Sequence, residues 1–326
     1  MTPEATRTGE CRAPGAAGSP ATAGSRAVAG SSATAITAQA GAKAAAENFP
    51  VALRFLPRGY RGHLAAVYGF ARSADDMGDE AAPGERLALL DELEADLERL
   101  YRMVSRAGPA GGGPVSPGAD GPPRLTVVRA LAPAVAACGI PAQPFRDLIA
   151  ANRMDQVVSR YPAYADLLEY CRLSANPVGR IVLHIFGAAT PGREALSDRV
   201  CTALQLAEHW QDVAEDLRAG RIYLPQEDMD RFGCAEQDLA AARAAPRVRA
   251  LIAFEERRAR ALLDAGAPIV GTLRGAARAA VAGYVAGGRA ALAAIAASGH
   301  DVLRATPRPG KSRVAAELVK AYATGR

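Results

Sequence analysis

The sequence predicts an all-α protein, and three observations support that fold class. Of the 326 residues, 49% are hydrophobic but only 5% are aromatic, so Ala, Leu and Val must build most of the core. Ala and Leu favour helices, while residues that favour strands are sparse. Apolar side chains also recur at helical spacing over long stretches. Length alone would allow one or two domains.

Residues 1–41 are predicted to be a disordered tail, and the folded domain is expected over residues 42–326. The tail consists mainly of Ala, Gly, Ser, Thr and Pro. So few large apolar side chains cannot offset the entropy that is lost on ordering. The tail also lacks the charged start and Leu-rich run of a secretory signal, and its Pro and Gly interrupt the pattern of a transit peptide.

The first helices are predicted from apolar spacing and from proline and glycine stops. Pro50 suits the first turn of a helix that Pro57 and Gly59 would end. In residues 61–80, apolar positions three and four apart form one face that leads into an acidic end. Residues 85–101 place leucines on one side and acidic residues on the other, which is typical of an ordinary amphipathic helix.

The rest of the chain is divided by a loop and by one internal proline. A flexible loop is expected at residues 105–123, which are rich in Gly and Pro. A long helix over residues 164–187 should break near Pro177, because proline removes a backbone donor and clashes with the preceding turn. The other helices are expected, in chain order, at residues 125–138, 143–158, 194–217, 226–231, 236–242, 247–265, 273–297 and 312–322.

One stretch, residues 205–225, predicts an acidic stripe on a helix. Glu208, Asp212 and Asp216 recur every four residues, so each lies only about 40° further round the axis. Like charges at that spacing weaken an isolated helix. A divalent cation such as Mg²⁺ would account for the stripe, because it takes carboxylate oxygens together with substrate phosphates. A solvated acidic helix face is the alternative that this stretch alone leaves open.

A second acidic cluster lies much earlier in the chain, in the segment SADDMGDE. Asp75 and Asp79 are four residues apart and share a helix face, as do Asp76 and Glu80. An EF-hand is excluded, because its loop needs ligands at alternate positions, a central glycine and a late glutamate within twelve residues. Two such helices can face each other across a bundle, where carboxylates without cations would be severely unfavourable. Together the clusters predict a metal site.

Basic and hydroxyl groups beside the two clusters fit a polyphosphate bridged by metal ions. Arg72 lies three residues before Asp75, while Arg221 and Tyr223 follow the second cluster. Arg offers a planar fork to phosphate oxygens, and Tyr donates a hydrogen bond without adding charge. The alternatives are a salt bridge from Arg72 to a neighbouring carboxylate and core packing for Tyr223. No Walker loop or GxGxxG motif is present, which argues against a nucleotide.

Composition argues against several other classes of protein. The five cysteines are far apart, without a CxxC pair, which predicts reduced thiols and a cytoplasmic protein. The four histidines lack zinc-ligand spacing. Lys and Arg are scattered despite a formal net charge of +5, which argues against a nucleic-acid partner. No uninterrupted apolar run is as long as a membrane span, since the longest candidate, residues 279–297, contains Arg289.

The two acidic motifs, FARSADDMGDE and QLAEHWQDVAEDLRAGRIYLP, resemble the aspartate-rich regions of the squalene and phytoene synthase family. The resemblance runs from about Glu47 to at least Pro225. Three features, ENFPVALRFLP, YCRLSANPVGRIVLHIFG and the HWQD form of the second motif, are most similar to the hydroxysqualene-forming branch in bacterial hopanoid biosynthesis. The resemblance implies a single-domain isoprenoid synthase helical bundle with a central active-site cavity.

The resemblance also implies roles for individual residues. The catalytic carboxylates would be Asp75, Asp79, Asp212 and Asp216. Mg²⁺ ligands would come from both clusters, namely Asp75, Asp76, Asp79, Glu80, Glu208, Asp212 and Asp216. The substrate would be contacted by Asn48, Tyr68, Arg72, Asn176, Arg180, Arg221 and Tyr223. Family members usually have Asn at the position of Glu208, so this chain adds a negative charge there.

The implied reaction is the Mg²⁺-dependent conversion of presqualene diphosphate to hydroxysqualene. Metal ions would stabilise the departing diphosphate, and the cation would rearrange in an apolar pocket before one water adds. Two alternatives stay open: head-to-head condensation of prenyl diphosphates to squalene or phytoene, and a non-catalytic scaffold with the same fold. The resemblance also implies a hand-off from a sister enzyme that makes presqualene diphosphate, and at most peripheral contact with the inner membrane.

Overall fold

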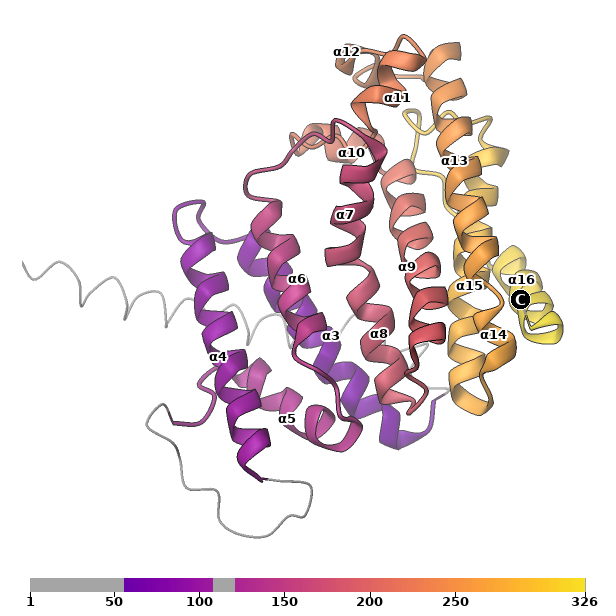
Figure 1. Ribbon diagram of the computed structural model, residues 1–326. Coiled ribbons are helices and arrows are strands. Elements are labelled where there is room, and N and C mark those ends of the chain that lie inside the picture. The colour runs from indigo at the N-terminus through magenta and orange to yellow at the C-terminus, as the bar shows by residue number, and fades with distance from the viewer. Residues whose placement is uncertain (1–55, 108–120, 326) are drawn as a thin grey trace, which may run out of the picture.

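The computed structural model describes residues 56–107 and 121–325 (Figure 1). The predicted tail, the helix expected around Pro50 and the substrate residue Asn48 therefore lie outside the described residues, as does most of the loop expected at residues 105–123.

The described chain is all-α, which confirms the predicted fold class. Its only β-type pairing, within the described ranges, is an isolated parallel bridge between Arg160 and Ile222. The helices, in chain order, are α3 (Arg58–Asp79), α4 (Arg86–Ala107), α5 (Thr126–Cys138), α6 (Gln143–Met154), α7 (Tyr164–Ser174), α8 (Asn176–Ile185), α9 (Pro191–Gln211), α10 (Val213–Arg218), α11 (Gln226–Arg231), α12 (Glu236–Leu239), α13 (Pro246–Gly266), α14 (Ile269–Thr272), α15 (Gly275–Ala297) and α16 (Lys311–Thr324).

Two helix boundaries show how local sequence sets the ends. The predicted break at Pro177 is confirmed, because α7 ends at Ser174 and α8 starts at Asn176 with proline in its first turn. The helix expected over residues 194–217 is interrupted, however, since Asp212 leaves the helical region at φ −104° and ψ 15°. That interruption separates α9 from α10.

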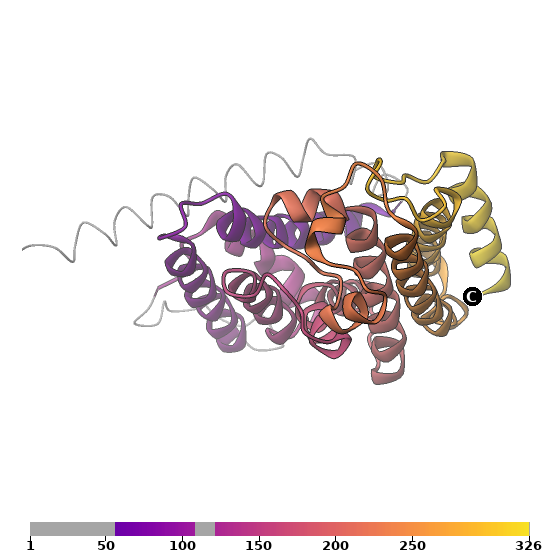
Figure 2. The ribbon, with the colours of Figure 1, turned by 90° about the horizontal axis from the view of Figure 1, so that it is seen from above.

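The helices form an elongated bundle (Figure 1). Seen from above, α3 and α4 lie at one end and α16 lies at the other (Figure 2). The central helices α7, α8 and α9 lie between these ends, and α9 packs along α13. The C-terminal ends of α3, α6 and α9 all lie toward the end of the bundle where α10 is found (Figure 1).

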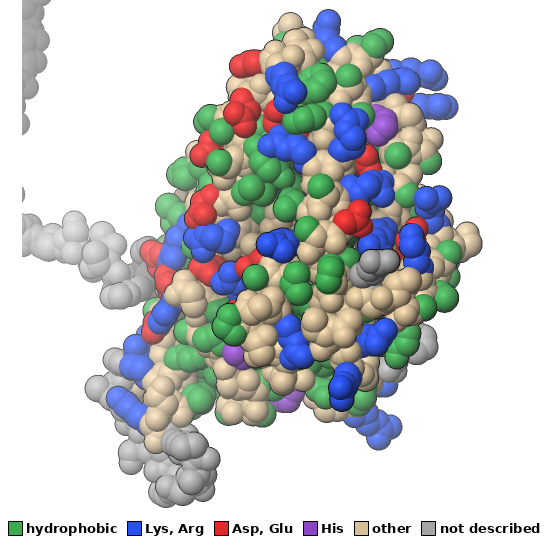
Figure 3. All heavy atoms as spheres, turned by 45° about the vertical axis from the view of Figure 1, so that its right-hand side comes forward, with side chains coloured by type: hydrophobic (Ala, Val, Ile, Leu, Met, Phe, Trp, Pro, Cys, Tyr) green, Lys and Arg blue, Asp and Glu red, His purple; other side chains and the backbone are tan. Residues whose placement is uncertain are grey.

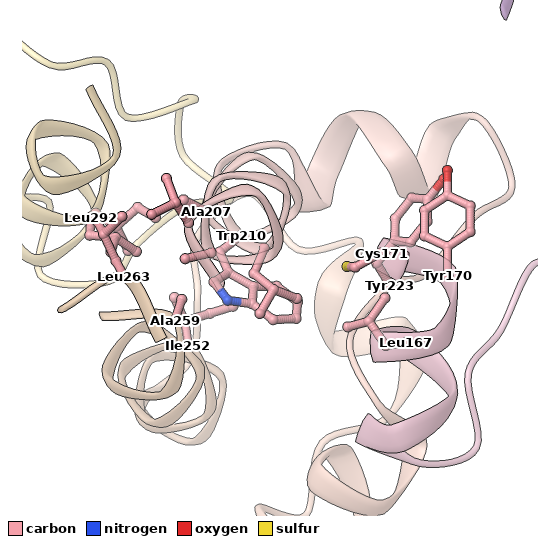
Figure 4. Close-up of a cluster of buried hydrophobic side chains, with 14 of the residues drawn as sticks. Leu167, Tyr170, Cys171, Ala207, Trp210, Tyr223, Ile252, Ala259, Leu263 and Leu292 are labelled. Carbon is pink, nitrogen blue, oxygen red and sulfur yellow. The ribbon is translucent and has the colours of Figure 1, made fainter. Parts of the chain in front are cut away.

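Buried hydrophobic side chains form two clusters on either side of α8. The first joins α3, α4, α5 and α6, and it includes Ile181 and Val182 of α8. The second joins α7, α9, α13 and α15, with Trp210 fully buried at its centre. Trp210 lies beside Ile252 and Ala259 of α13 (Figure 4). Because α8 contributes to both clusters, it fixes the spacing between the two halves of the bundle.

The four described cysteines are free thiols, in agreement with the predicted reduced state. Helix α15 is long and apolar enough to span a membrane, with a mean hydropathy of 1.4 over its best window. This finding differs from the prediction that no apolar run reaches that length. However, α15 packs against α9, α13 and α16, and a core helix of a bundle passes the same test. The helix is therefore part of the bundle core.

The contact of α13 with α9 depends on Gly266. A Cβ atom at this position would lie 2.7 Å from the carbonyl oxygen of Leu196 and 2.9 Å from the backbone nitrogen of Val200. Backbone atoms cannot move aside as a flexible side chain can, so Gly266 allows the two helices to approach closely.

We therefore expect Gly266→Ala to lower the free energy of unfolding by about 2 kcal/mol, because it forces α13 away from α9. Gly283→Ala is the matched control, since Gly283 lies within α15 and a Cβ there would meet nothing within 4 Å. The control should stabilise the protein by about 0.5–1 kcal/mol. Urea unfolding measures both values, and a shift of the two variants in the same direction would contradict the packing argument.

Candidate active site

The first acidic cluster lies on the last turns of α3 and is tied to α6. The side-chain nitrogen of Asn152 donates a hydrogen bond of 3.1 Å to Asp75. Gly78 makes this approach possible, because a Cβ atom there would lie 2.6 Å from the side-chain oxygen of Asn152. Gln156 also donates to the carbonyl oxygen of Gly78, at 3.0 Å. Helix α6 therefore sets the position of the α3 carboxylates.

Arg72 makes the intrahelical salt bridge that was one of its two predicted roles. Its Nε lies 2.9 Å from Asp76, and its guanidinium lies 3.6 Å from Glu80. Asp76 is only 3% exposed, so the arginine neutralises a buried carboxylate. Contact between Arg72 and a diphosphate stays a prediction.

The second acidic cluster keeps its four-residue spacing across the break between α9 and α10. The backbone nitrogen of Asp212 donates to the carbonyl oxygen of Glu208 at 3.0 Å, and that of Asp216 donates to Asp212 at 2.9 Å. The chain then turns, and the backbone nitrogen of Arg221 donates to the carbonyl oxygen of Asp216 at 2.8 Å. This turn directs Arg221 toward the first cluster.

Arg221 joins the two clusters through an ion pair, whereas its predicted contact with a diphosphate stays a prediction. Its Nη2 lies 2.6 Å from a carboxylate oxygen of Asp79. The same guanidinium lowers the pKa values of Asp155 and Asp216, although burial outweighs it at both residues. One cation therefore acts on carboxylates from three separate segments.

The acidic groups of the two clusters influence one another's pKa values. Burial raises the pKa of Asp75, and the charge of Asp79 raises it further. Burial also raises the pKa of Glu208, followed by the charges of Asp212 and Asp75. Asp216 has a pKa of about 7, mainly because of burial and then because of Asp212. Since Asp75 acts on Glu208, the α3 and α9 carboxylates lie within electrostatic reach of each other.

This donor set fits a divalent cation that is shared with a phosphate group. Nowhere in the described ranges do three Asp, Glu, His or Cys side chains stand close enough together to hold a metal ion by themselves. Mg²⁺ does not require such a cage, because it usually keeps several waters and binds one or two carboxylates together with substrate phosphates. Facing carboxylates with raised pKa values are also the groups that a cation would stabilise most.

Asp155 is an acidic group of this site that the sequence analysis missed. It caps α6, and one of its oxygens accepts a hydrogen bond of 2.9 Å from the hydroxyl of Tyr170. Its other oxygen is buried without a hydrogen-bond partner among the described residues. Burial raises its pKa to about 6, and the charges of Asp79 and Asp75 contribute to the shift. Asp155 has no helical acidic partner in the sequence, so only the fold reveals it.

Tyr223 has the packing role that was one of its two predicted roles. It is 7% exposed, and its ring stacks on His209 with 3.7 Å between the centroids. Tyr223 also lies beside Tyr170 of α7 (Figure 4). Burial lowers the pKa of His209 to about 3, so the imidazole is neutral and adds no cation to the site. The stack fixes the segment that carries Arg221.

An apolar cavity of about 360 Å³ lies next to the carboxylates. Helices α3, α8, α9 and α15 provide most of its wall. Tyr68, one of the predicted substrate residues, lines this cavity, and so does Glu208, which is the only charged lining residue among those that the structure describes. The volume lies in the range of 300–1,000 Å³ that is typical of small-molecule pockets. Glu208 therefore stands where the apolar cavity meets the acidic clusters.

Two other predicted substrate residues lie on α8 and face α9. The side-chain oxygen of Asn176 accepts a hydrogen bond of 2.9 Å from Thr202. Arg180 forms a two-pronged contact with Asp198, at 2.6 and 3.0 Å. Neither residue is among those that line the cavity. Their contacts hold α8 against α9, and a role in substrate binding stays a prediction, as it does for Asn48.

The fold and the site define an all-α protein whose facing carboxylates border an apolar cavity. Residues 42–314 match the squalene/phytoene synthase family, so the chain belongs to this family. It is an isoprenoid synthase of the class that acts on prenyl diphosphates.

Two curated relatives and one crystal structure illustrate this membership. The chain is 33% identical over 231 residues to a hydroxysqualene synthase of Rhodopseudomonas palustris, which covers 70% of this chain and 72% of the relative. It is 32% identical over 230 residues to a 15-cis-phytoene synthase of Synechococcus elongatus, and this match covers 66% of this chain and 68% of that relative. The crystal structure of squalene synthase HpnC from Alicyclobacillus acidocaldarius is 42% identical, with a TM-score of 0.69, and covers 78% of this chain and 89% of that chain.

The raised pKa of Asp216 predicts that this residue destabilises the protein when no cation is bound. A carboxyl group with a raised pKa in the folded state resists ionisation, so stability is lost as the pH rises from about 4 toward 7. We expect Asp216→Asn to raise the free energy of unfolding at pH 8 by up to about 4 kcal/mol without divalent cation, because burial raises the pKa of Asp216 from 3.8 to about 7 and each pKa unit corresponds to about 1.4 kcal/mol.

Denaturant unfolding at pH 4 and pH 8 measures this effect. At pH 4, where Asp216 is protonated in the folded protein, the variant and the natural protein should be equally stable. A variant that is no more stable than the natural protein at pH 8 would contradict the electrostatic account.

Proposed function

We propose that this enzyme converts presqualene diphosphate to hydroxysqualene in squalene and hopanoid biosynthesis, with Mg²⁺ as cofactor. The observation that carries the proposal is the apolar cavity that meets two facing carboxylate clusters at Glu208. A long hydrocarbon with a diphosphate at one end has the complementary shape and polarity. The relative named hydroxysqualene synthase supports hydroxysqualene as the product.

The protein residues would act first on the diphosphate. Asp75, Asp79, Asp212 and Asp216 would hold the metal ions, which supply Lewis-acid stabilisation of the leaving group when they are bound. Arg221 would donate to phosphate oxygens, since its planar fork suits them and its partner Asp79 would turn to the metal.

The cavity would control the fate of the carbocation. The carbon–oxygen bond to the diphosphate breaks, and the cation rearranges against apolar side chains that exclude most water. One water then adds its oxygen to the cation and loses a proton, so the products are hydroxysqualene, diphosphate and a proton. Glu208 is a charged residue of the cavity wall, and we propose that it would retain this water.

Head-to-head condensation of two prenyl diphosphates is the second candidate. The similarity to a 15-cis-phytoene synthase favours it, because that relative covers nearly the same share of the chain. Both reactions would use the same carboxylates, so the acidic site does not discriminate between them.

The two candidates are separated by supplying purified enzyme and Mg²⁺ with presqualene diphosphate or farnesyl diphosphate in separate reactions. We expect hydroxysqualene from presqualene diphosphate and no C30 product from farnesyl diphosphate alone. Mass spectrometry of the extracted lipids identifies the products. Phytoene, squalene or hydroxysqualene from a simple prenyl diphosphate would overturn the single-step assignment.

Asp75→Ala and Asp212→Ala should each lower Mg²⁺-dependent diphosphate release by at least about a hundredfold, because each removes a ligand for a charge that develops in the transition state. Asp91→Ala is a suitable control, since Asp91 is an exposed acidic residue of α4 that pairs with Arg153. Circular dichroism should show unchanged helix content in all three. If either site variant kept full activity, its carboxylate would have no part in catalysis.

A further inference from the structure

The C-terminal helix α16 exposes an unusual amount of apolar surface. Ala321 is the only buried residue of this 14-residue helix. Leu318, Val319 and Tyr322 are 38%, 70% and 46% exposed, respectively. These are three of the seven large hydrophobic residues that are exposed in the described chain, and two of the other four line the active-site cavity.

The exposed apolar residues of α16 share one face of the helix. With 100° per residue, Leu318, Val319 and Tyr322 fall within one stripe, and Ala321 falls on the side that meets the bundle. This stripe, Leu318–Val319–Tyr322, therefore borders the buried side and points into solvent. An amphipathic helix that only completes a bundle would turn such residues inward.

Contacts at the C-terminal end of α16 hold it in this orientation. The guanidinium of Arg278 in α15 lies 4.9 Å from the ring of Tyr322 and also donates to the carbonyl oxygen of that residue. Gly325 packs on Gly271, because a Cβ atom on Gly271 would lie only 2.9 Å from the carbonyl oxygen of Gly325. The bundle thus presents the stripe to solvent as part of its folded surface.

Positive charge is concentrated in the same part of the chain. Residues 302–326 contain six Lys or Arg and one acidic residue, Glu317, which is a net charge of +5. The whole chain also has a formal net charge of +5, so the other residues sum to zero. Three of the basic residues, Lys311, Arg313 and Lys320, lie on α16 itself. Arg304 and Arg308 precede the helix, and Arg308 acts on Asp212 of the acidic site, while Arg326 is the last residue of the chain.

Basic and hydrophobic side chains are both present on the surface around α16. Figure 3 turns this side of the molecule forward and shows Lys and Arg side chains among hydrophobic ones. Within the part of the chain that the structure describes, no ion pair is found for Lys311, Arg313 or Lys320. The match to the family also ends at residue 314, before the stripe begins.

We propose that α16 docks the enzyme on an anionic membrane surface. An apolar stripe beside basic side chains is the pattern of helices that lie in the plane of a membrane interface. Each Lys or Arg near an anionic surface adds attraction, and a bilayer accepts apolar side chains without a complementary partner shape.

A protein partner fits the stripe less well. A 14-residue helix is about 21 Å long, and one face about 10 Å wide covers roughly 200 Å². A standard protein interface needs about 800 Å² on each side. Membrane contact would give the enzyme access to very apolar prenyl compounds, and this benefit rests on the proposed function. The membrane binding itself does not rest on it.

The test is flotation of the full-length protein with vesicles and without substrate. One set of vesicles contains phosphatidylcholine alone, and the other contains phosphatidylcholine mixed with phosphatidylglycerol. We expect flotation with the mixed vesicles only, and we expect added salt to weaken it, because salt screens the attraction between exposed charges. No flotation of the natural protein with the mixed vesicles would overturn the proposal. Since no turnover is measured, failure of the proposed reaction would leave this result intact.

Two variants separate the apolar and the basic contributions. Val319→Glu places a charge in the stripe, and the double change Arg313→Glu with Lys320→Glu reverses two basic residues. Each should weaken binding to the mixed vesicles by at least roughly tenfold. Because all three side chains are exposed, the variants should keep the helix content of the natural protein.

Matched controls lie on α4, at the opposite end of the bundle from α16 (Figure 1). Leu87→Glu changes an exposed apolar residue, which is 50% exposed, and Arg102→Glu with Arg106→Glu makes the same change in net charge as the double variant of α16. Both controls should float like the natural protein. Equal loss in the controls would mean that net charge alone drives binding, and it would overturn the assignment of docking to α16. A dimer in light scattering that Val319→Glu dissociates, without flotation, would assign the stripe to self-association and overturn the proposal.

Discussion

The structure depends on one electrostatic constraint, which is that several carboxylates from different helices face each other beside an apolar cavity. Charges of the same sign repel, and burial makes each of them harder to ionise. The packing of α6 on α3 and the turn that carries Arg221 hold these groups together despite the repulsion. The repulsion among these carboxylates destabilises the protein when no cation is bound, and bound cations would relieve it. The site should therefore bind metal ions and their anionic partners.

The surrounding architecture provides the rigidity that this constraint demands. Close approach at Gly78 and Gly266 brings helices together where side chains would keep them apart. The aromatic stack of His209 and Tyr223 fixes the segment after the second cluster, and the buried Trp210 anchors the end of α9 in the larger core cluster. Stability away from the site therefore offsets the strain that the facing carboxylates impose.

Sequence reasoning found the parts of the site that follow local rules. Four-residue spacing identified Asp75 with Asp79 and Asp212 with Asp216, and proline chemistry located the break before α8. Tertiary contacts determine the rest. Asp155 has no local signature, because its partners come from other helices. Neither the pairing of Arg180 with Asp198 nor the side of α16 that the bundle covers can be read from spacing.

The central claim is that the carboxylate clusters bind a diphosphate through divalent cations. The most direct measurement is calorimetric titration of the full-length protein with inorganic diphosphate, once with Mg²⁺ and once with a chelator. Binding of metal and diphosphate must be reciprocally coupled if they share the site. The account predicts diphosphate affinity at least about a hundredfold higher with Mg²⁺, whereas equal affinity under both conditions would contradict it.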